Sequence, residues 1–456
     1  MAVNLDTTYG FINYTNNRLI YPKGQNNMYS FYTKMNRLLL HHDTTISIVH
    51  IGGSHVQADC FTHYFRQMLC NMGDSLSSSR GLIFPFHAAH TNGPNNYCTQ
   101  YEGTWVGNRN SKPSDGQPLG ISGWSIATDD SLSTISVRIN PTINNDTVWL
   151  FNQITLLGAS YNNQLVPLLI VNTDTIAPEF IPHHEAYKYQ WTEPTYQAKV
   201  IFMPFDYYFI NYKIKKKLYN PIKHSIYHSP KEQYPILSKD TILHTTTSNG
   251  WNHKFNLRGF ICENNQKKGF TVNSLGANGA SIPSWLRCYE FSEELELIKP
   301  DLVIMGIGIN DAYCKYGKFK PEEFKNNYRT LISRIQKVNP NVSILFLTNN
   351  DSYYRASRRS KRICNKNGAL VQQAFLELAK EYDTAVWDMY DVMGGYKSMA
   401  QWEKAKLARR DKIHFTREGY RYLAHLFYKA FIKDYINFFE TQNTTIYKPC
   451  IPENNL

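Results

Sequence analysis

Residues 45–54 have the sequence TISIVHIGGS, an apolar run that ends in two glycines and a serine. A short continuous apolar run bounded by glycine is typical of a buried strand in a parallel sheet. Residues 58–72 then follow a helical pattern, so this stretch predicts a strand followed by a helix. Active sites of open parallel sheets gather at the carboxyl ends of the strands. The residues that directly follow this strand are therefore candidates for a functional site.

The second half of the chain repeats this alternation. Strand-like runs begin at Gly269, Asp301, Asn341 and Thr384, and helical patterns cover residues 321–338, residues 367–382 and the segment after Thr416. An alternation of buried strands and amphipathic helices predicts a parallel sheet with helices on both faces.

Residues 91–270 follow a different pattern. Short strand-like runs occur at Thr134–Ile139, Thr147–Phe151, Leu165–Val171, Lys199–Met203 and Tyr207–Lys213, separated by Asn, Pro, Gly and Thr. Many short strands with turn signals between them indicate a β-sandwich. We therefore predict an α/β domain in two parts, residues 1–90 and 271–456, with a β-rich domain of residues 91–270 inserted between them.

Composition sets broad limits on the function. The chain of 456 residues favours two domains, and it contains no run of 18 or more apolar residues that would indicate a membrane span. Its N-terminus lacks the basic and apolar pattern of a signal peptide. The eight cysteines form no C-x-x-C pair, and the net charge of +12 favours anionic polymers as partners. Two basic runs, residues 213–217 and 355–362, lie in no recognisable nucleic-acid-binding module.

The segments after the predicted strands carry the residue types that acyl transfer needs. Ser54 is a candidate nucleophile, and His414 a candidate base that Asp411, three residues earlier, orients. The backbone N–H groups of Ser54 and Gly279 and the side chain of Asn310 are candidates for the oxyanion hole.

Other polar residues near these segments have simpler interpretations. His55 is expected to support the loop, and Asp311 to bond loop backbone. His87 and His90 have helical spacing for a metal but no evident third ligand, so no metal and no cofactor is expected.

Taken in order, these clusters resemble the four motif blocks of the SGNH (GDSL-like) hydrolase family over residues 45–90 and 270–435. Gly308-Ile309-Asn310-Asp311 is similar to the G-x-N-D block, and Asp411 with His414 to the D-x-x-H block. The usual Gly-Asp-Ser is Gly52-Gly53-Ser54 here, which affects the local loop geometry more than the reaction. Gly276 is an alternative block-two glycine, but Gly279 follows Asn278 as in many relatives. The resemblance implies a flavodoxin-like three-layer α/β/α hydrolase domain with an inserted β-sandwich.

A narrower resemblance points to the bacterial peptidoglycan O-acetylesterase branch. It rests on Gly53–Gln57, on the β-rich insertion, and on Gly394–Met399 with Trp402. The resemblance implies a carbohydrate-binding-module-like insertion, an acetylated polysaccharide as substrate, and a periplasmic or extracellular location. Trp124 and Trp285 are candidates for sugar-stacking faces, and the alternative is that both are core aromatics. The sequence leaves the oligomeric state open.

Three other functions remain open from the sequence. The same triad serves lipid esterases and thioesterases, although no amphipathic lid is evident. A glycan-binding protein with a decayed site is supported only by Gly53. Nucleic-acid binding through the basic runs would require salt-dependent retention on DNA.

Overall fold

The computed structural model describes residues 8–24, 27–73, 76–113, 116–139, 149–208, 253–355 and 359–446. The chain forms two compact units. The α/β unit comprises Met1–Ser77, Lys268–Leu286 and Lys299–Leu456, and the β-rich unit comprises Ser78–Lys267 and Arg287–Ile298. The structure thus places residues 78–90 and 287–298 in the β-rich unit, whereas the sequence pattern placed them in the α/β domain. The basic run 213–217 lies outside the described residues.

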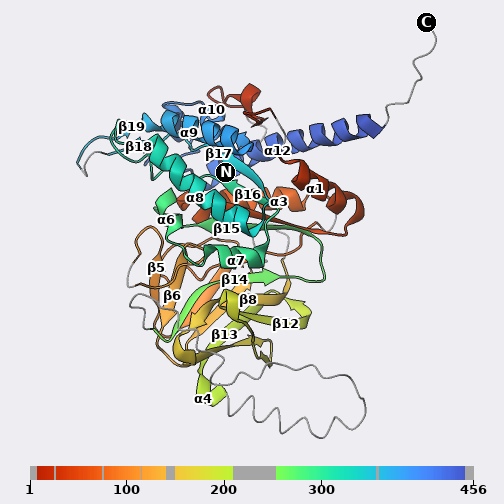
Figure 1. Cartoon of the computed structure of the whole chain (residues 1–456). Coiled ribbons are helices and arrows are strands. Elements are labelled where there is room, and N and C mark those ends of the chain that lie inside the picture. Colours follow the sequence, from red (N-terminus) through yellow and green to blue (C-terminus); the bar gives the residue numbers. More distant parts are fainter. Residues whose placement is uncertain are drawn as a thin grey trace, which may run out of the picture. The chain divides into compact units, whose positions relative to one another are not determined.

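One sheet forms the centre of the α/β unit (Figure 1). Its strands are β1 (Leu19–Ile20), β20 (Ala385–Trp387), β17 (Ser343–Leu347), β16 (Leu302–Met305), β2 (Thr45–Gly52) and β15 (Gly269–Gly276), in this spatial order. All neighbouring pairs are parallel except β1 with β20. In chain order the parallel strands are arranged two-one-three-four-five, which is the flavodoxin-like order.

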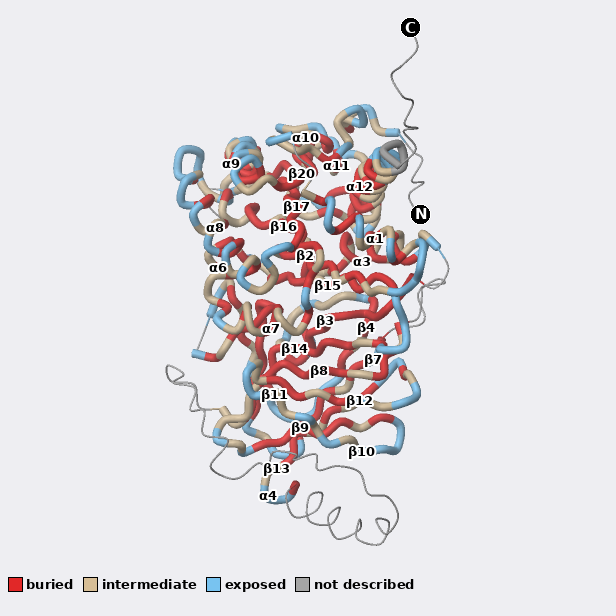
Figure 2. The backbone as a smooth tube through the Cα atoms, turned by 45° about the vertical axis from the view of Figure 1, so that its right-hand side comes forward, coloured by how far each residue is buried: buried red, intermediate tan, exposed pale blue. Residues whose placement is uncertain are grey.

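Helices cover both faces of this sheet, which gives the three layers. The helices α1 (Tyr29–His41), α3 (Cys60–Cys70) and α12 (Arg417–Ile446) share one apolar core with strand residues such as Ile46 and Ile48. The helices α8 (Pro321–Val338) and α9 (Asn367–Tyr382) cover the other face, where Tyr328 packs edge-on against Phe346 and Phe375. Figure 2 shows the strands as a continuous buried layer. The fold class predicted from the sequence is confirmed.

Short elements complete the α/β unit. They are α2 (Ser54–Gln57), α6 (Ile282–Leu286), α10 (Met389–Val392), α11 (Ser398–Lys404) and the paired strands β18 (Tyr353–Tyr354) and β19 (Ile363–Cys364). Among the described residues, none of the helices combines the length and the apolar character of a membrane span.

The β-rich unit is built from two antiparallel sheets. One contains β10 (Asp174–Ile176), β9 (Leu165–Val171), β13 (Gln197–Pro204), β7 (Thr134–Ile139) and β4 (Tyr97–Glu102). The other contains β11 (Glu179–Ile181), β12 (Ala186–Thr195), β8 (Phe151–Ser160), β14 (Phe255–Glu263), β6 (Trp124–Thr128) and β5 (Val106–Arg109), with β3 (Gly81–Ile83) beside β14.

Aromatic rings join these two sheets into a sandwich. Phe202 of β13 contacts Phe255 of β14 at a ring distance of 4.7 Å. The helix α7 (Phe291–Ile298) belongs to the same unit, where the buried carboxylate of Glu294 pairs with the buried guanidinium of Arg258. Two strand predictions need correction. Of the predicted strand Thr147–Phe151, only Phe151 lies in a strand among the described residues, at the start of β8. Tyr207 and Tyr208 end a short helix, α4 (Phe205–Tyr208). The rest of that predicted strand lies outside the described residues.

Candidate active site

The candidate nucleophile lies where strand β2 of the parallel sheet ends. The order β15-β2-β16 places β2 between the two strands whose following loops carry Gly279 and Asn310. In the register of β2 and β15, Gly52 is opposite Gly276, so both strands end at the same level. The short helix α2 begins immediately afterwards, at Ser54. Three segments that are distant in the sequence therefore meet at one edge of the sheet.

The imidazole of His414 connects the nucleophile to a carboxylate. Nε2 of His414 is 2.8 Å from Oγ of Ser54, and Nδ1 is 2.9 Å from Oδ2 of Asp411. A carboxylate only accepts hydrogen bonds, so Nδ1 carries the proton and Nε2 is left to accept the serine proton. The side chains of His414 and Asp411 are about one-third exposed, so the site is open to solvent.

The turn around Asp411 fixes this carboxylate. Its Oδ1 accepts the backbone N–H groups of Ile413 and His414, both at 2.9 Å. Partial burial raises the pKa of Asp411, but the hydrogen bonds from the ring and backbone of His414 and from Ile413 outweigh it and hold the pKa well below its usual value. Asp411 is therefore ionised at neutral pH and stabilises a positive charge on the imidazole.

Two glycines of the second loop have different roles. A Cβ atom on Gly276 would lie 2.1 Å from the backbone nitrogen of Gln57, so Gly276 lets α2 pack directly on the end of the strand. Gly279 has a φ of +76°, a turn conformation that glycine adopts without strain. The side-chain oxygen of Gln57 accepts the N–H of Asn278 at 2.6 Å and thereby ties this turn to the nucleophile helix.

Asn310 lies beside the turn that precedes the nucleophile. Its Nδ2 donates to the carbonyl of Ala280 at 2.9 Å, and a Cβ atom on Gly53 would lie 3.4 Å from the same nitrogen. An amide nitrogen carries two protons, so one N–H remains for another acceptor. A Cβ atom at Gly53 would make only ordinary contacts, so space alone does not require a glycine where related sequences have aspartate.

Asp311 fastens the second loop to the third. Both carboxyl oxygens lie close to the N–H of Ile282, at 3.1 and 3.2 Å. Burial raises the pKa of Asp311 to about 7, although this hydrogen bond opposes the rise. The expected loop-supporting interaction is thus present in the structure, with a carboxyl group that is half protonated near neutral pH.

This pKa predicts a pH-dependent contribution of Asp311 to stability. Its folded-state pKa lies above the unfolded value near 4, so the folded chain binds more protons between pH 4 and 7. The stabilisation is complete below pH 4 and is lost as the pH rises through 7, at up to about 1.4 kcal/mol per pH unit. In urea unfolding at pH 4.5, 6 and 8, the advantage of wild type over Asp311→Asn should shrink with rising pH. A difference that does not change with pH would contradict the assignment.

The two tryptophans expected to bind sugar are buried. Trp285 is fully buried, and Trp124 is 3 % exposed and packs against Phe84 and Phe86. Neither ring offers a free face to a ligand, because neighbouring side chains cover both. This corrects the expectation from the sequence: we interpret both residues as core aromatics.

Histidine clusters occur outside the candidate site. Nδ1 of His87 bonds the carbonyl of Thr99 at 3.1 Å, which is a structural role. In the β-rich unit, His183, His184 and Glu296 bring three potential ligand atoms within 4.8 Å of one another, and His184 already bonds the carboxylate of Glu296 at 3.1 Å. Among the described histidines, cysteines and acidic residues, this is the group of three whose ligand atoms lie close enough together to hold a metal ion.

Comparison with known proteins agrees with this geometry. Residues 246–422 match the model of the GDSL-like lipase/acylhydrolase family. The matched range contains Gly279, Asn310, Asp411 and His414. Ser54 comes earlier in the sequence, before the inserted β-rich unit begins. This match over part of the chain, together with the fold, supports a carboxylic ester hydrolase.

The fold is similar to that of a solved peptidoglycan O-acetylesterase. The two chains are 18 % identical with a TM-score of 0.66, and the similarity covers 92 % of this chain and 99 % of that one. An acetylxylan esterase from Geobacillus stearothermophilus is 20 % identical with a TM-score of 0.28, over 37 % of this chain and 73 % of that one. None of the curated proteins compared matches the chain.

Proposed function

We propose that the protein removes O-acetyl groups from an acetylated polysaccharide, with Ser54, His414 and Asp411 as the catalytic triad. The observation that carries this proposal is the continuous chain of hydrogen bonds from the Ser54 hydroxyl through the His414 ring to the Asp411 carboxylate. His414 takes the serine proton while Oγ attacks the acetyl carbon. It then returns the proton to the sugar oxygen as that oxygen leaves. Water, activated by the same ring, hydrolyses the acetyl-serine and releases acetate.

The oxyanion of each tetrahedral intermediate would be bound by three donors: the N–H of Ser54, the N–H of Gly279 and the free N–H of Asn310. The contacts of Gln57 with Asn278, and of Asn310 with Ala280, hold these donors in one place before substrate arrives. Donors that are already oriented cost no reorganisation during the reaction.

Asn310→Ala should lower kcat about 100- to 1000-fold with a smaller effect on KM, because an oxyanion donor acts mainly in the transition state. Steady-state hydrolysis of p-nitrophenyl acetate measures the effect. Asn326→Ala is the matched control, because Asn326 is exposed on α8 and its side chain accepts a hydrogen bond from Arg329. If Asn310→Ala and the control had the same kcat, Asn310 would not be an oxyanion donor.

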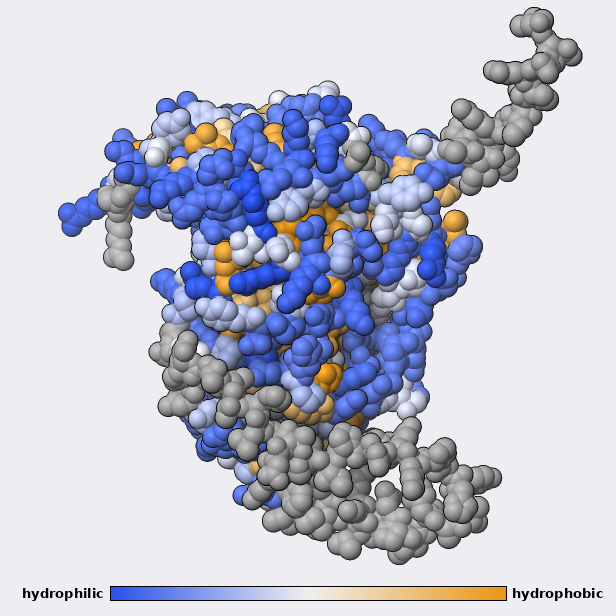
Figure 3. Space-filling view, viewed as in Figure 1, coloured by the Kyte–Doolittle hydropathy of each residue, from blue (hydrophilic) through white to orange (hydrophobic). Residues whose placement is uncertain are grey.

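An acidic glycan fits the candidate site better than a neutral one. The exposed side chains of Arg409 and Arg410 directly precede Asp411 in the chain, and the guanidinium of Arg362 bonds the Asp411 carbonyl at 3.2 Å. These cations would attract a polymer that carries carboxylates, such as peptidoglycan. Figure 3 shows a mostly hydrophilic face of the α/β unit that is interrupted by hydrophobic patches.

Acetate release tests the substrate. Purified protein would be incubated with O-acetylated peptidoglycan and with O-acetylated xylan at equal acetyl concentration. We expect faster release from peptidoglycan, with an advantage that falls as salt rises, because screening weakens the attraction of the carboxylates. Release from neither polymer, together with retained hydrolysis of p-nitrophenyl acetate, would refute the polysaccharide assignment and leave an esterase of another substrate class.

A further inference from the structure

Tyr420 connects the turn that carries the nucleophile to the turn that carries the base. It lies in the first turn of α12, and its hydroxyl is 2.7 Å from Nδ1 of His55, the residue after Ser54. Burial raises the pKa of this hydroxyl, and the nearby backbone of Phe415, the residue after His414, opposes the rise. With the Tyr420 hydroxyl as the donor of this bond, the neutral ring of His55 accepts at Nδ1.

The ring of His55 also lies directly beside the ring of His414. Their centroids are 5.2 Å apart at an angle of 38°. Burial, and then the proximity of His414, lower the pKa of His55 to about 3. His55 is therefore neutral at physiological pH, so it does not repel the positive charge that His414 acquires during the reaction. It restricts the movement of that ring by contact.

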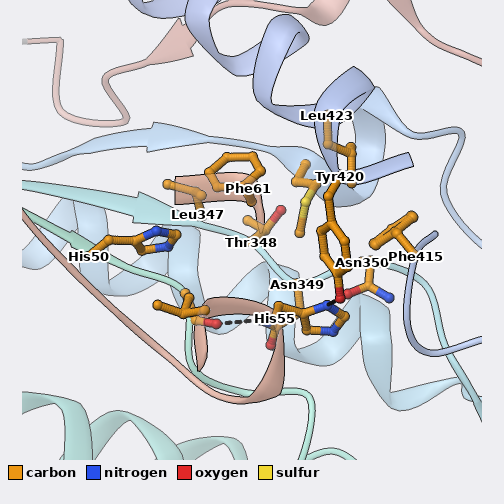
Figure 4. A pocket seen from close by; sticks show the side chains of 13 residues that line it. His50, His55, Phe61, Leu347, Thr348, Asn349, Asn350, Phe415, Tyr420 and Leu423 are labelled. Carbon is orange, nitrogen blue, oxygen red and sulfur yellow. Dashed lines mark hydrogen bonds between the residues drawn. The ribbon is translucent and has the colours of Figure 1, made fainter. Parts of the chain in front are cut away.

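A small pocket lies behind His55 (Figure 4). Its volume is about 40 Å³, and its lining includes His55, Tyr420, Asn349 and Asn350. With Nδ1 accepting from Tyr420, the proton of the neutral His55 ring is on Nε2. This atom is buried and has no partner among the described residues, and the same holds for Oδ1 of Asn349 and Oδ1 of Asn350.

Water would satisfy all three of these atoms. A cavity of about 10–15 Å³ is enough for one water molecule, which also needs two to four polar partners. The pocket is therefore large enough. A water molecule in the pocket can accept from Nε2 of His55, and the oxygens of Asn349 and Asn350 offer it acceptors in the same lining. The other histidine in the lining, His50, already bonds Thr62 through Nδ1 at 2.8 Å.

We propose that Tyr420 and His55 are positioning residues that hold the base next to the nucleophile, and that water in the pocket completes the hydrogen bonds of His55. This inference rests on the proposed triad. The Tyr420 hydroxyl bonds the residue after Ser54, and its own helix α12 begins three residues after His414, so this bond links the two turns that carry the reacting groups.

The test is a double-mutant cycle on p-nitrophenyl acetate hydrolysis. Tyr420→Phe and His55→Leu should each lower kcat about 10- to 100-fold with KM little changed, since small displacements of reacting groups have effects of this size. The double variant should be no slower than the slower single variant, because both changes remove the same bond. Tyr422→Phe is the control: it removes another hydroxyl of the same helix, which bonds Tyr14 at 2.7 Å.

Each outcome has a definite meaning. Wild-type kcat in Tyr420→Phe, or effects that multiply in the double variant, would overturn the positioning role while the triad stands. Full activity in Ser54→Ala would instead refute the triad, and the inference with it. A high-resolution crystal structure of the wild type provides a readout that does not depend on the variants folding. Density for water within hydrogen-bond distance of Nε2 of His55 is expected, and an empty pocket would overturn the hydration of His55.

Discussion

Ser54→Ala should hydrolyse p-nitrophenyl acetate about a million times more slowly in kcat than the wild type. The hydroxyl that forms the covalent intermediate is lost, and no other hydroxyl is shown within hydrogen-bond distance of Nε2 of His414 in the described structure. The remaining activity would come from the oxyanion donors alone. Initial rates at saturating substrate, divided by the concentration of folded protein, measure the ratio.

Ser333→Ala is the matched control for this substitution. Ser333 is exposed on α8, so its removal changes the composition in the same way without touching the site. It should keep wild-type rates. A Ser54→Ala protein that retained more than about a thousandth of the wild-type kcat would show that another group carries the acyl transfer, because serine nucleophile variants typically lose far more.

Asp411→Asn should lower kcat about 10,000-fold while leaving the fold intact. An asparagine can keep the oxygen that accepts from the N–H groups of Ile413 and His414. The amide nitrogen then faces Nδ1 of His414 and donates to it. The ring proton consequently moves to Nε2, which can no longer accept the proton of Ser54.

Asp383→Asn provides the control for the second prediction. Asp383 caps the end of α9 with a φ of 54°, a conformation that asparagine also adopts readily. Its substitution should change neither kcat nor the melting temperature much. If Asp411→Asn lost stability as well as activity, kcat would be calculated from the concentration of active sites, measured by titration, instead of from total protein. Full activity at normal stability would contradict an orienting role for Asp411.

The sequence predicted the α/β fold well because its strands are short apolar runs that end in glycine. Strand β2 and the helices α8 and α9 lie within a few residues of the expected positions. The parallel arrangement also explains why motifs more than 200 residues apart were expected to meet, since carboxyl ends of neighbouring strands share one edge. The inserted sandwich is also confirmed. It was predictable because its short strands are separated by clear turn signals.

Other features were not predictable from the sequence. Tyr420 belongs to an ordinary amphipathic helix, and only the folded chain shows that its hydroxyl reaches His55. The two tryptophans were misplaced because aromatic residues suit a core and a sugar platform equally well, and only burial distinguishes the two. Gly276 and Gly279 also differ only through their surroundings, a close backbone approach in one case and a positive φ in the other.

Covalent trapping of the nucleophile tests the central claim most directly. The wild type would be treated with a fluorophosphonate, digested and analysed by mass spectrometry, with Ser54→Ala and Asp411→Asn in parallel. We expect one phosphonylated residue, Ser54, modified fast in the wild type and slowly in Asp411→Asn. Modification of a different residue in step with inactivation, or unchanged labelling of Ser54→Ala, would contradict the account.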